Sequence, residues 1–401
     1  MPFSRKMLMV TISGVDRSGV LAVFSRILVA HQVEIVDIQQ ASLHRFLGLY
    51  VLVDLERNPK AADPLIKDLL FEASRLDLNL NYQFVSSTEV GEDTRPHFYV
   101  LTHFGDTRFL AEISQILGEQ KVNIQTVVSR KHHLARSVEM VIDVGEAASL
   151  SQFKKRIMAT SRQFDTDVAL QRMEAYRKNK RLIFFDMDST LVDVEIIDQM
   201  ARLAGVFKEV ARITDKAMQG ELDFEESLVQ RVALLKGLPV EKLIEIRDNL
   251  KLSEGAEELV RTLKWLGFVT GVVTGGFAFF SDFIKEKLGF DYAFANRLDI
   301  KNGVLTGRLA GKVVDAAEKA RIVNQTACER GIPLDQTVVV GDGANDALML
   351  GQAGLAIAYN AKKGLDRVAH VALGKSRMAH IFHLLGITER DIEEATHCTP
   401  S

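Results

Sequence analysis

LIFFDMDST, residues 182–190, joins a run of four apolar residues to two carboxylates, Asp186 and Asp188. Short, continuous apolar runs are typical of strands that are buried on both faces of a parallel sheet. Ligands of open α/β sheets bind beyond the carboxyl ends of such strands. If the backbone stays extended, both carboxylates face one side, because Met187 between them points the other way. The segment therefore predicts an α/β domain with a carboxylate pair at its ligand-binding edge.

Two later apolar runs also end in residues suited to phosphate or metal binding. Thr274-Gly275-Gly276 follows GVV, and GDGAND, residues 341–346, follows VVV. A threonine hydroxyl donates hydrogen bonds, and a glycine lets a backbone N–H approach a phosphate oxygen closely. Clustered carboxylates repel one another without a cation, and oxygen ligands select a hard ion such as Mg²⁺. The three strand ends predict a magnesium-dependent phosphate site, although the chain has no GxxxxGK[ST] loop.

Each of these motifs taken alone also allows a simpler interpretation. A single DxD pair is usually a solvated surface or turn feature, and GDGAND alone is compatible with a turn. An EF-hand calcium loop is excluded, because Thr190 stands where the third acidic ligand would be and no glycine follows it. The combination of three polar strand ends, each after a buried strand and in this order, favours the site.

Two copies of one pattern precede the α/β domain. Residues 1–86 contain a strand, a GVDRSG turn, a helix, two strands, a helix and a last strand, which is the β-α-β-β-α-β order of a ferredoxin-like domain. Residues 96–173 repeat this order after the polar linker SSTEVGEDTRP, and MEAYRKNKR forms a second linker. The α/β domain spans 180–390. About seventy residues of mainly helical pattern between its first two strands predict an inserted cap at about 197–252.

Composition narrows the class of partner. A net charge of -3 provides no global field to hold nucleic acid or an anionic membrane, so a small molecule is the expected partner. Cys328 and Cys398 lack the spacing of a zinc site or a disulfide framework, which fits a reducing cytoplasm. Polar residues interrupt the N-terminal apolar run too early for a secretion signal, and no segment is apolar for long enough to span a bilayer.

The sequence resembles the haloacid dehalogenase superfamily of phosphatases, whose motifs are present as Asp186-x-Asp188-x-Thr190, Thr274, Lys319 and GDGAND with Asp342 and Asp346. Within this superfamily the resemblance is to the phosphoserine phosphatases and covers roughly residues 180–385. It implies a Rossmann-like parallel-sheet core with a helical cap. It also implies hydrolysis of O-phospho-L-serine to L-serine and phosphate, the last step of serine biosynthesis.

The same resemblance implies roles for the motif residues. Asp186 is the expected nucleophile that forms an aspartyl-phosphate, and Asp188 is the expected acid and base. The carboxylates of Asp186 and Asp342 and the backbone carbonyl of Asp188 would hold Mg²⁺.

Further residues complete the implied phosphate site. Thr274, where the family often has serine, Gly275 and Lys319 would bind the phosphoryl oxygens. Asn345 would contact phosphate or substrate. Asp346 would support Lys319 and the metal site from behind.

Substrate specificity is expected to depend on residues in and before the cap. By the same resemblance, Glu195 and Arg231 would bind the ammonium and carboxylate groups of the amino acid. Taken alone, each would be interpreted as a surface charge. Met218 and Phe224 match positions that line the family's substrate cavity, and a place in the helix core is the alternative. Another phosphoester, such as phosphothreonine or a phosphoprotein, remains open as the substrate, as does an inactive amino-acid sensor.

The two N-terminal repeats resemble ACT domains, small modules that commonly bind amino acids at strand-to-helix turns. In the first copy, Asp16 and Gly19 lie in a turn before a helix, whose free N–H groups suit a carboxylate. We expect an amino-acid effector, serine, to bind there. In the second copy, Arg108 stands where the first has Ser18 or Gly19, which argues against ligand binding. Domains that only drive formation of a homodimer are the alternative.

Overall fold

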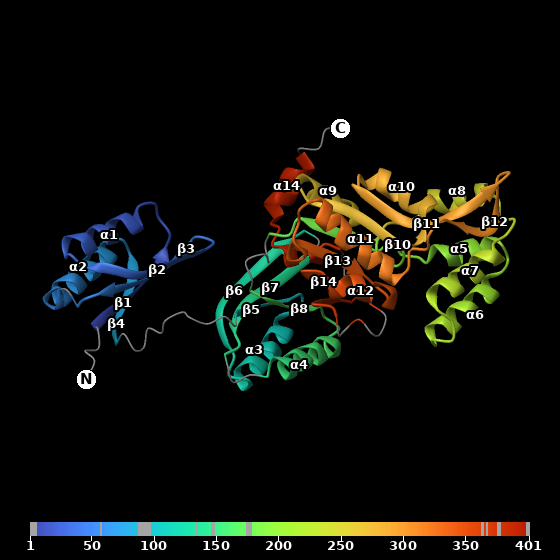
Figure 1. Ribbon diagram of the computed structural model, residues 1–401. Helices are drawn as coiled ribbons and strands as arrows, with labels where there is room; N and C mark the ends of the chain where they lie inside the picture. Colours follow the sequence, from blue (N-terminus) through green and yellow to red (C-terminus); the bar gives the residue numbers. More distant parts are fainter. Residues whose placement is uncertain are drawn as a thin grey trace. The chain divides into compact units, whose positions relative to one another are not determined.

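The computed structural model describes most of the chain, namely residues 6–56, 58–86, 98–133, 135–145, 149–173, 179–361, 365, 368–374 and 378–397. Its contacts divide the chain into two compact units, Met1–Thr94 and Arg95–Ser401, each of which is described by itself (Figure 1). Most of both predicted linkers, and Cys398, lie outside the described residues. None of the helices in the described ranges combines the length and apolar character that a membrane span requires.

The first unit is a four-stranded antiparallel sheet with two helices on one face (Figure 1). Its strands follow the order β2-β3-β1-β4. Leu8, Val10 and Ile12 alternate along β1 and pack against Phe24 of α1, so the period-two pattern of the strand meets the apolar stripe of the helix. The predicted β-α-β-β-α-β order is confirmed, with elements β1 Lys6–Val15, α1 Val20–Ala30, β2 Glu34–Leu43, β3 Phe46–Asp54, η1 Pro59–Ala61, α2 Ala62–Arg75 and β4 Leu78–Ser86.

The second repeat has the same topology but does not stand alone. Its strands follow the order β8-β5-β7-β6, and β8 also pairs with strand β15 of the α/β core. The repeat therefore extends the sheet of the core, and the two share one eleven-stranded sheet. Its elements are β5 Phe98–His103, α3 Thr107–Glu119, β6 Asn123–His132, β7 Ala135–Asp143, α4 Leu150–Gln163 and β8 Val168–Arg172.

The strand order of the α/β core explains why distant motifs meet. β9 lies between β10 and β13, and the three strands are parallel, so their carboxyl ends lie side by side at one edge. Each strand of this centre is a buried apolar run, as predicted. The core strands are β9 Leu182–Phe185, β10 Val269–Phe277, β11 Tyr292–Lys301, β12 Val304–Ala310, β13 Thr337–Gly341, β14 Leu355–Tyr359 and β15 Val371–Leu373.

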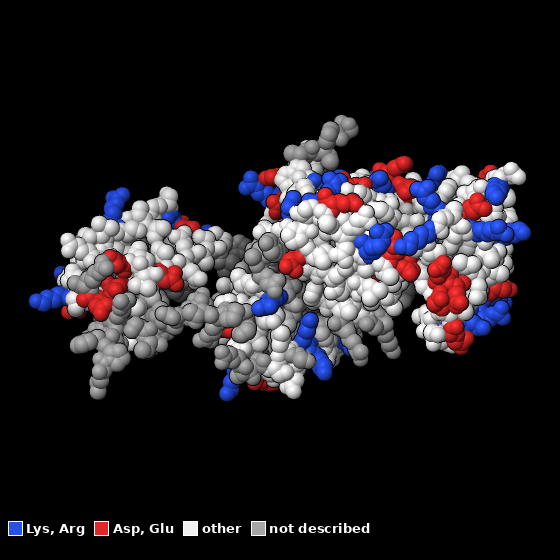
Figure 2. Space-filling view, viewed as in Figure 1, with Lys and Arg blue, Asp and Glu red and all other residues white. Residues whose placement is uncertain are grey.

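Four helices between β9 and β10 form the predicted cap: α5 Ile196–Leu203, α6 Phe207–Met218, α7 Phe224–Leu234 and α8 Val240–Asp248. The remaining helical elements belong to the core: α9 Ala256–Trp265, α10 Ala278–Leu288, α11 Ala316–Glu329, η2 Leu334–Gln336, η3 Ala344–Asp346, α12 Ala347–Gly351, α13 His380–Leu385 and α14 Glu389–His397. On the face drawn in Figure 2, positive and negative side chains are interspersed over the second unit, in keeping with the small net charge.

Candidate active site

The two carboxylates of the DxD motif are placed by a strand end and a turn. β9 stops at Phe185, and Asp186 follows directly at the sheet edge. The carbonyl of Met187 accepts backbone N–H groups from Leu191 at 2.9 Å and Val192 at 3.1 Å, so the chain turns back at once. The extended backbone expected for this motif is therefore a tight turn. In this turn the side chain of Met187 is buried in the core, and the side chains of Asp186 and Asp188 on either side of it both line one cavity.

This cavity, of about 140 Å³, lies at the carboxyl ends of β9, β10 and β13 and reaches the cap. Parallel strand ends meet the cap helices α5 and α7 here, which is the expected place for a ligand in this class of fold. Most of the side chains singled out from the sequence line it: Asp186, Asp188, Glu195, Phe224, Arg231, Thr274, Gly275, Asp342 and Asn345.

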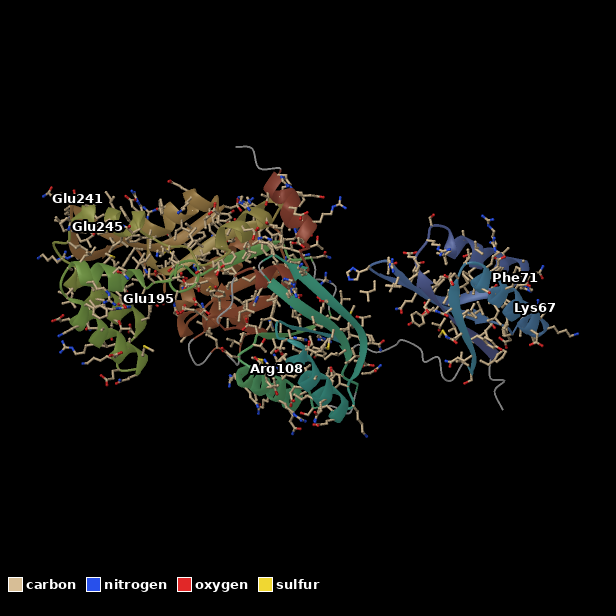
Figure 3. The ribbon with its side chains drawn as sticks, turned by 180° about the vertical axis from the view of Figure 1, so that it is seen from behind. Lys67, Phe71, Arg108, Glu195, Glu241 and Glu245 are labelled. Carbon is tan, nitrogen blue, oxygen red and sulfur yellow. The ribbon has the colours of Figure 1, made fainter. Side chains whose placement is uncertain are left out.

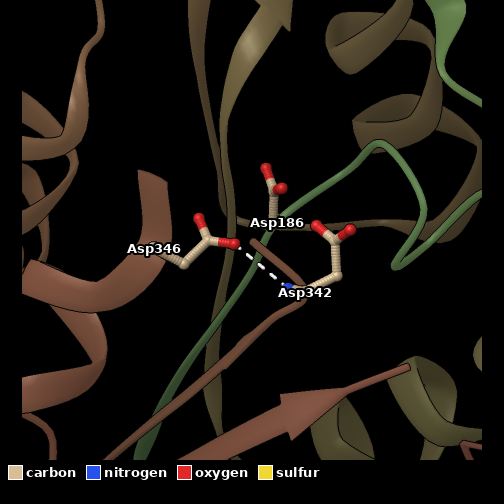
Figure 4. Close-up of side chains that lie close together, drawn as sticks. All are labelled: Asp186, Asp342 and Asp346. Carbon is tan, nitrogen blue, oxygen red and sulfur yellow. Dashed lines mark hydrogen bonds between the residues drawn. The ribbon is translucent and has the colours of Figure 1, made fainter. Parts of the chain in front are cut away.

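Lys319 approaches the cavity from below through a buried ion-pair network. Its Nζ donates to Asp186 Oδ1 at 2.9 Å and to Asp346 Oδ1 at 2.7 Å, and all three side chains are buried. The second oxygen of Asp346 accepts the backbone N–H groups of Asp342 at 3.1 Å and Gly343 at 3.2 Å (Figure 4). Burial alone would lower the pKa of Lys319, but the two carboxylates raise it above its usual value, so the ammonium stays charged.

The carboxylates form a cluster that suits a cation. Oxygens of Asp186, Asp342 and Asp346 all lie within 4.8 Å of one another (Figure 4). Burial, reinforced by Asp346 and opposed by Lys319, raises the pKa of Asp186 to about 7. An all-oxygen set of this kind fits a hard divalent ion, which would offset the repulsion and return Asp186 to its ionised form.

Asp188 has a different environment from Asp186. Its Oδ1 accepts the backbone N–H of Ile196, the first residue of α5, at 3.2 Å. Burial first, and then the charges of Glu195 and Asp186, raise the pKa of Asp188 well above its usual value. The hydrogen bonds of the two carboxylates differ, because Asp186 accepts from the Lys319 ammonium and Asp188 accepts from a backbone N–H. This contrast suits Asp186 for attack and Asp188 for proton transfer.

The Thr274-Gly275-Gly276 segment has no room for larger side chains. A Cβ on Gly275 would lie 2.7 Å from the ring of Phe224, and a Cβ on Gly276 would lie 2.5 Å from Asp188 Oδ2. The N–H of Gly276 donates to Thr274 Oγ1 at 2.9 Å, which leaves the hydroxyl hydrogen available to an acceptor in the cavity. The two glycines therefore let the cap and Asp188 close over a hydrogen-bond donor.

The cap side of the cavity carries a pair of opposite charges. Glu195 is the residue before α5 (Figure 3). Ser189 donates its hydroxyl to Glu195 Oε1 at 3.1 Å. Arg231 lies on α7, where burial lowers its pKa while Glu195, Asp198 and Asp188 act against that effect. A carboxylate and a guanidinium thus line the same cavity.

Three predicted residues of the catalytic domain do not line the cavity. Lys319 and Asp346 lie behind it and are linked to it by the ion pair of Lys319 with Asp186. Met218 is different. It is the last residue of α6 and is 73% exposed, because this helix buries only Val210 among its described side chains.

Sequence reasoning missed Ser189, which donates to Glu195, and it named Gly276 only as part of the strand end, without the close approach to Asp188. The Gly-Gly pair after a buried strand was a usable signal for Gly276, whereas Ser189 has none outside the structure.

The predicted effector residues of the first unit also lie together. Asp16 and Gly19 line a surface cavity of about 560 Å³ at the start of α1, with His44 and Arg45 on its other side. Gly19 precedes the helix at φ 91° and offers no capping side chain, so the first N–H groups of α1 face this cavity.

The second repeat closes the equivalent helix start with its own side chain. Asp106 accepts the backbone N–H groups of Arg108 at 3.0 Å and Phe109 at 3.1 Å. Arg108 in turn donates from Nε to Asp106 at 2.8 Å (Figure 3). The N–H groups that could receive a ligand carboxylate are already used, which argues in the same direction as Arg108 in the sequence.

Comparison with known proteins agrees with this organisation. The family of haloacid dehalogenase-like hydrolases matches residues 180–354, and the ACT domain family matches residues 6–83. Phosphoserine phosphatase of Streptomyces coelicolor is 38% identical over 97% of this chain and 94% of its own length. Phosphoserine phosphatase SerB2 of Mycobacterium tuberculosis is 34% identical over 96% of this chain and 95% of its own length.

A solved structure is similar to most of this chain. It is a probable phosphoserine phosphatase from Vibrio cholerae, which is 33% identical and covers 76% of this chain and 90% of its own, with a TM-score of 0.59.

Proposed function

The chain belongs to the phosphoserine phosphatase family of haloacid dehalogenase-like hydrolases, and we propose that it hydrolyses O-phospho-L-serine to L-serine and phosphate. The choice of substrate is supported by one observation: Glu195 and Arg231 line the same cavity as Asp186 and Asp188. Their opposite charges complement the ammonium and carboxylate of a free amino acid, and a phosphoprotein side chain has neither group.

Asp186 is the proposed nucleophile. Its carboxylate oxygen attacks phosphorus, the bond from phosphorus to the serine oxygen breaks, and an aspartyl-phosphate forms. Asp188, whose pKa is raised, gives its proton to the departing serine oxygen. It then accepts a proton from the water that attacks the aspartyl-phosphate, which restores both carboxyl groups and releases phosphate.

The phosphoryl group is held by three donors on two elements, β10 and α11. Lys319 supplies a charged ammonium, Thr274 a hydroxyl, and Gly275 a backbone N–H at the same strand end. Asn345 on the opposite rim adds an amide that could reach phosphate or substrate.

Mg²⁺ is the proposed cofactor, held by Asp186 and Asp342 together with the backbone carbonyl of Asp188. When bound, it would neutralise charge on the phosphoryl group. Asp346 holds Lys319 and the Asp342 backbone in place behind this site.

Release of phosphate from free phosphoserine, measured with and without added Mg²⁺ after chelation, tests the proposal directly. Phosphothreonine and a phosphoserine peptide serve as competing substrates. Rapid release from phosphoserine only with Mg²⁺ is expected. Equal or faster release from the peptide would favour the phosphoprotein alternative, and no release from any substrate would favour an inactive sensor.

Three variants test the proposed roles. Asp186→Asn should form no acyl-phosphate in rapid-quench experiments, because an amide is a poor nucleophile. Arg231→Ala and Glu195→Gln should each weaken hydrolysis of phosphoserine by roughly 1.5–3 kcal/mol, with little effect on an aryl phosphate. Equal losses on both substrates would instead assign Arg231 and Glu195 to chemistry or folding.

We further propose that serine binds the first ACT domain beside Asp16 and Gly19, and that the enzyme works as a cytoplasmic homodimer in serine biosynthesis. Exposed apolar side chains on the helices of this domain support an interface there, such as Val29 at 75% and Phe71 at 66%. Figure 3 labels Phe71. Sedimentation of wild type and Phe71→Ser tests the dimer, which the variant should weaken.

A further inference from the structure

The phosphate-binding segment lies in an irregularity of the sheet. Pairing between β10 and β11 runs up to Val273 opposite Phe294 and resumes only with Phe277 opposite Asn296. Residues 274–276 therefore stand opposite the single residue between those partners, and they leave the ladder of hydrogen bonds. Bulges of this kind re-aim backbone and side chains, but they also leave polar backbone groups to be satisfied in another way.

The side chain of Asn296 satisfies one of these groups. Asn296 is 1% exposed, and its Nδ2 donates to the carbonyl of Gly275 at 2.8 Å. Its Oδ1 accepts the backbone N–H of Val314, also at 2.8 Å. One rigid amide thus joins the Thr274–Gly276 loop to the segment that leads into α11.

At the loop end, this hydrogen bond sets the direction of a hydroxyl group. The carbonyl of Gly275 and the N–H of Gly276 belong to one trans peptide and point in opposite directions. With the carbonyl held by Asn296, the N–H is directed to Thr274 Oγ1, to which it donates at 2.9 Å. The threonine hydroxyl is then an acceptor toward the backbone and a donor toward the cavity.

At the helix end, the same side chain positions the start of α11. Val314 precedes Asp315, whose side chain caps α11 by accepting from Glu318 N at 2.7 Å. The carbonyl of Asp315 accepts the backbone N–H of Lys319 at 2.9 Å. The first turn that carries Lys319 is therefore held at a fixed place relative to β11.

We propose that Asn296 is a positioning residue that sets the spacing between Thr274-Gly275 and Lys319, the two sides of the phosphoryl site. It does not line the cavity and acts through these residues. The inference rests on the proposed phosphatase function of the same cavity. Asn296 should affect only the binding of the phosphoryl group, because Glu195 and Arg231, which would bind the amino-acid part of the substrate, belong to other elements.

Asn296→Asp provides the test, because it keeps the shape and the acceptor for Val314 but sets an oxygen against the Gly275 carbonyl. We expect kcat/KM to fall about tenfold to a hundredfold, for phosphoserine and p-nitrophenyl phosphate alike. The Kd of inorganic phosphate for the Mg²⁺-loaded protein, measured by calorimetry, should rise. The ratio of the two substrates should stay as in the wild type. The Asn296→Ser variant should lose less of kcat/KM, because the short serine side chain leaves room for a water that bridges to the Gly275 carbonyl.

Thr270→Val is the matched control. Thr270 is buried on β10, and its hydroxyl donates to Asp291 Oδ2 at 3.1 Å and accepts the Asp291 backbone N–H at 3.4 Å. The variant loses these two hydrogen bonds between β10 and the start of β11, away from the loop. It should lower Tm and leave kcat/KM and phosphate binding unchanged.

If Asn296→Asp changes Tm only, or if both Asn296 variants fail to fold, the residue is structural and the proposal is wrong. Phosphate binding by a wild type that is inactive on phosphoserine would count against the proposed substrate instead.

Discussion

The two ACT-like repeats share one topology and differ in what surrounds them. In the first, four strands form a complete sheet, and the described residues bury no polar side chain below the surface. The second continues the sheet of the catalytic core through β8 and β15, and it buries Thr102, His103, Ser137, Glu139, Thr160, Ser161 and Gln171. The comparison teaches that one fold can serve either as a separate module or as a structural extension of a neighbouring domain.

Specific contacts fix the second repeat to the core. Ser137 of β7 and His383 of α13 are hydrogen-bonded at 2.7 Å, and the ring of Phe104 stacks on His380 at 3.8 Å. Ala135 and Ala169 belong to the same apolar cluster as the core residues. Removal of this repeat would uncover buried surface and turn β15 into an edge strand.

The largest effect on stability is expected from deletions that remove the first repeat alone or both repeats. A chain beginning at Arg95 should unfold in urea at nearly the wild-type midpoint and keep its phosphatase activity. A chain beginning at Asn179 should lose roughly 3–5 kcal/mol of stability, because the stacking, the buried hydrogen bond and the apolar contacts are removed together. Similar midpoints for the two shortened chains would contradict the proposed difference.

The sequence predicted both repeats, since apolar periods of two and 3.6 residues are local properties of strands and helices. It also predicted most of the cavity, because each motif follows its own buried strand. It did not predict the pairing of β8 with β15, since nothing in the sequence specifies which edge a short strand joins. Met218 failed for a similar reason: its place depends on how a cap helix packs.

A second prediction uses His103 of the second repeat. Its ring packs beside Phe109 at 5.2 Å, and among the described residues neither ring nitrogen has a hydrogen-bond partner. Burial lowers the pKa of His103 to about 4, from 6.5 in the unfolded chain. Between pH 4 and pH 6.5 the unfolded state binds more protons than the folded state. The contribution of neutral His103 to the free energy of unfolding is therefore fully present above pH 6.5 and is lost as the pH falls toward 4.

The measurement is urea unfolding at pH 7 and pH 5. The contribution of His103 should fall by about 2 kcal/mol between them. His103→Leu should remove that part of the pH dependence and keep the rest. If wild type and variant lose the same stability between the two pH values, His103 is not the source.

A smaller effect concerns the helix starts. Asp106→Ala removes the side chain that accepts the N–H groups of Arg108 and Phe109, so Tm should fall by about 2–3 °C. Arg108→Ala should change Tm much less, because its exposed ion pair with Asp106 contributes little. Calorimetry of both variants checks the order. An equal loss in Arg108→Ala would mean that the ion pair, rather than the cap, holds this turn.

The smallest effect on stability, and the most direct on regulation, is expected at Gly19. Serine is both the product and the proposed effector, so inhibition at the catalytic cavity must be separated from inhibition at the first ACT domain. An effector changes activity only through different affinities for two states of the enzyme. Gly19→Gln should place its side chain over the open start of α1, where a Cβ meets no atom within 4 Å, and so block the cavity.

The control must match the strain of this substitution, since Gly19 has φ 91°. Gly145→Gln provides it, because Gly145 also has positive φ, at 61°, and open space, but lies in the second repeat. In inhibition curves for serine, the concentration that gives half of the inhibition through the first ACT domain should rise about tenfold or more in Gly19→Gln. It should not change in Gly145→Gln. Product inhibition should persist in both, and in the chain beginning at Arg95. If serine inhibits all four proteins alike, the cavity of the first ACT domain is not regulatory, and the difference between the two helix starts has no role in control by serine.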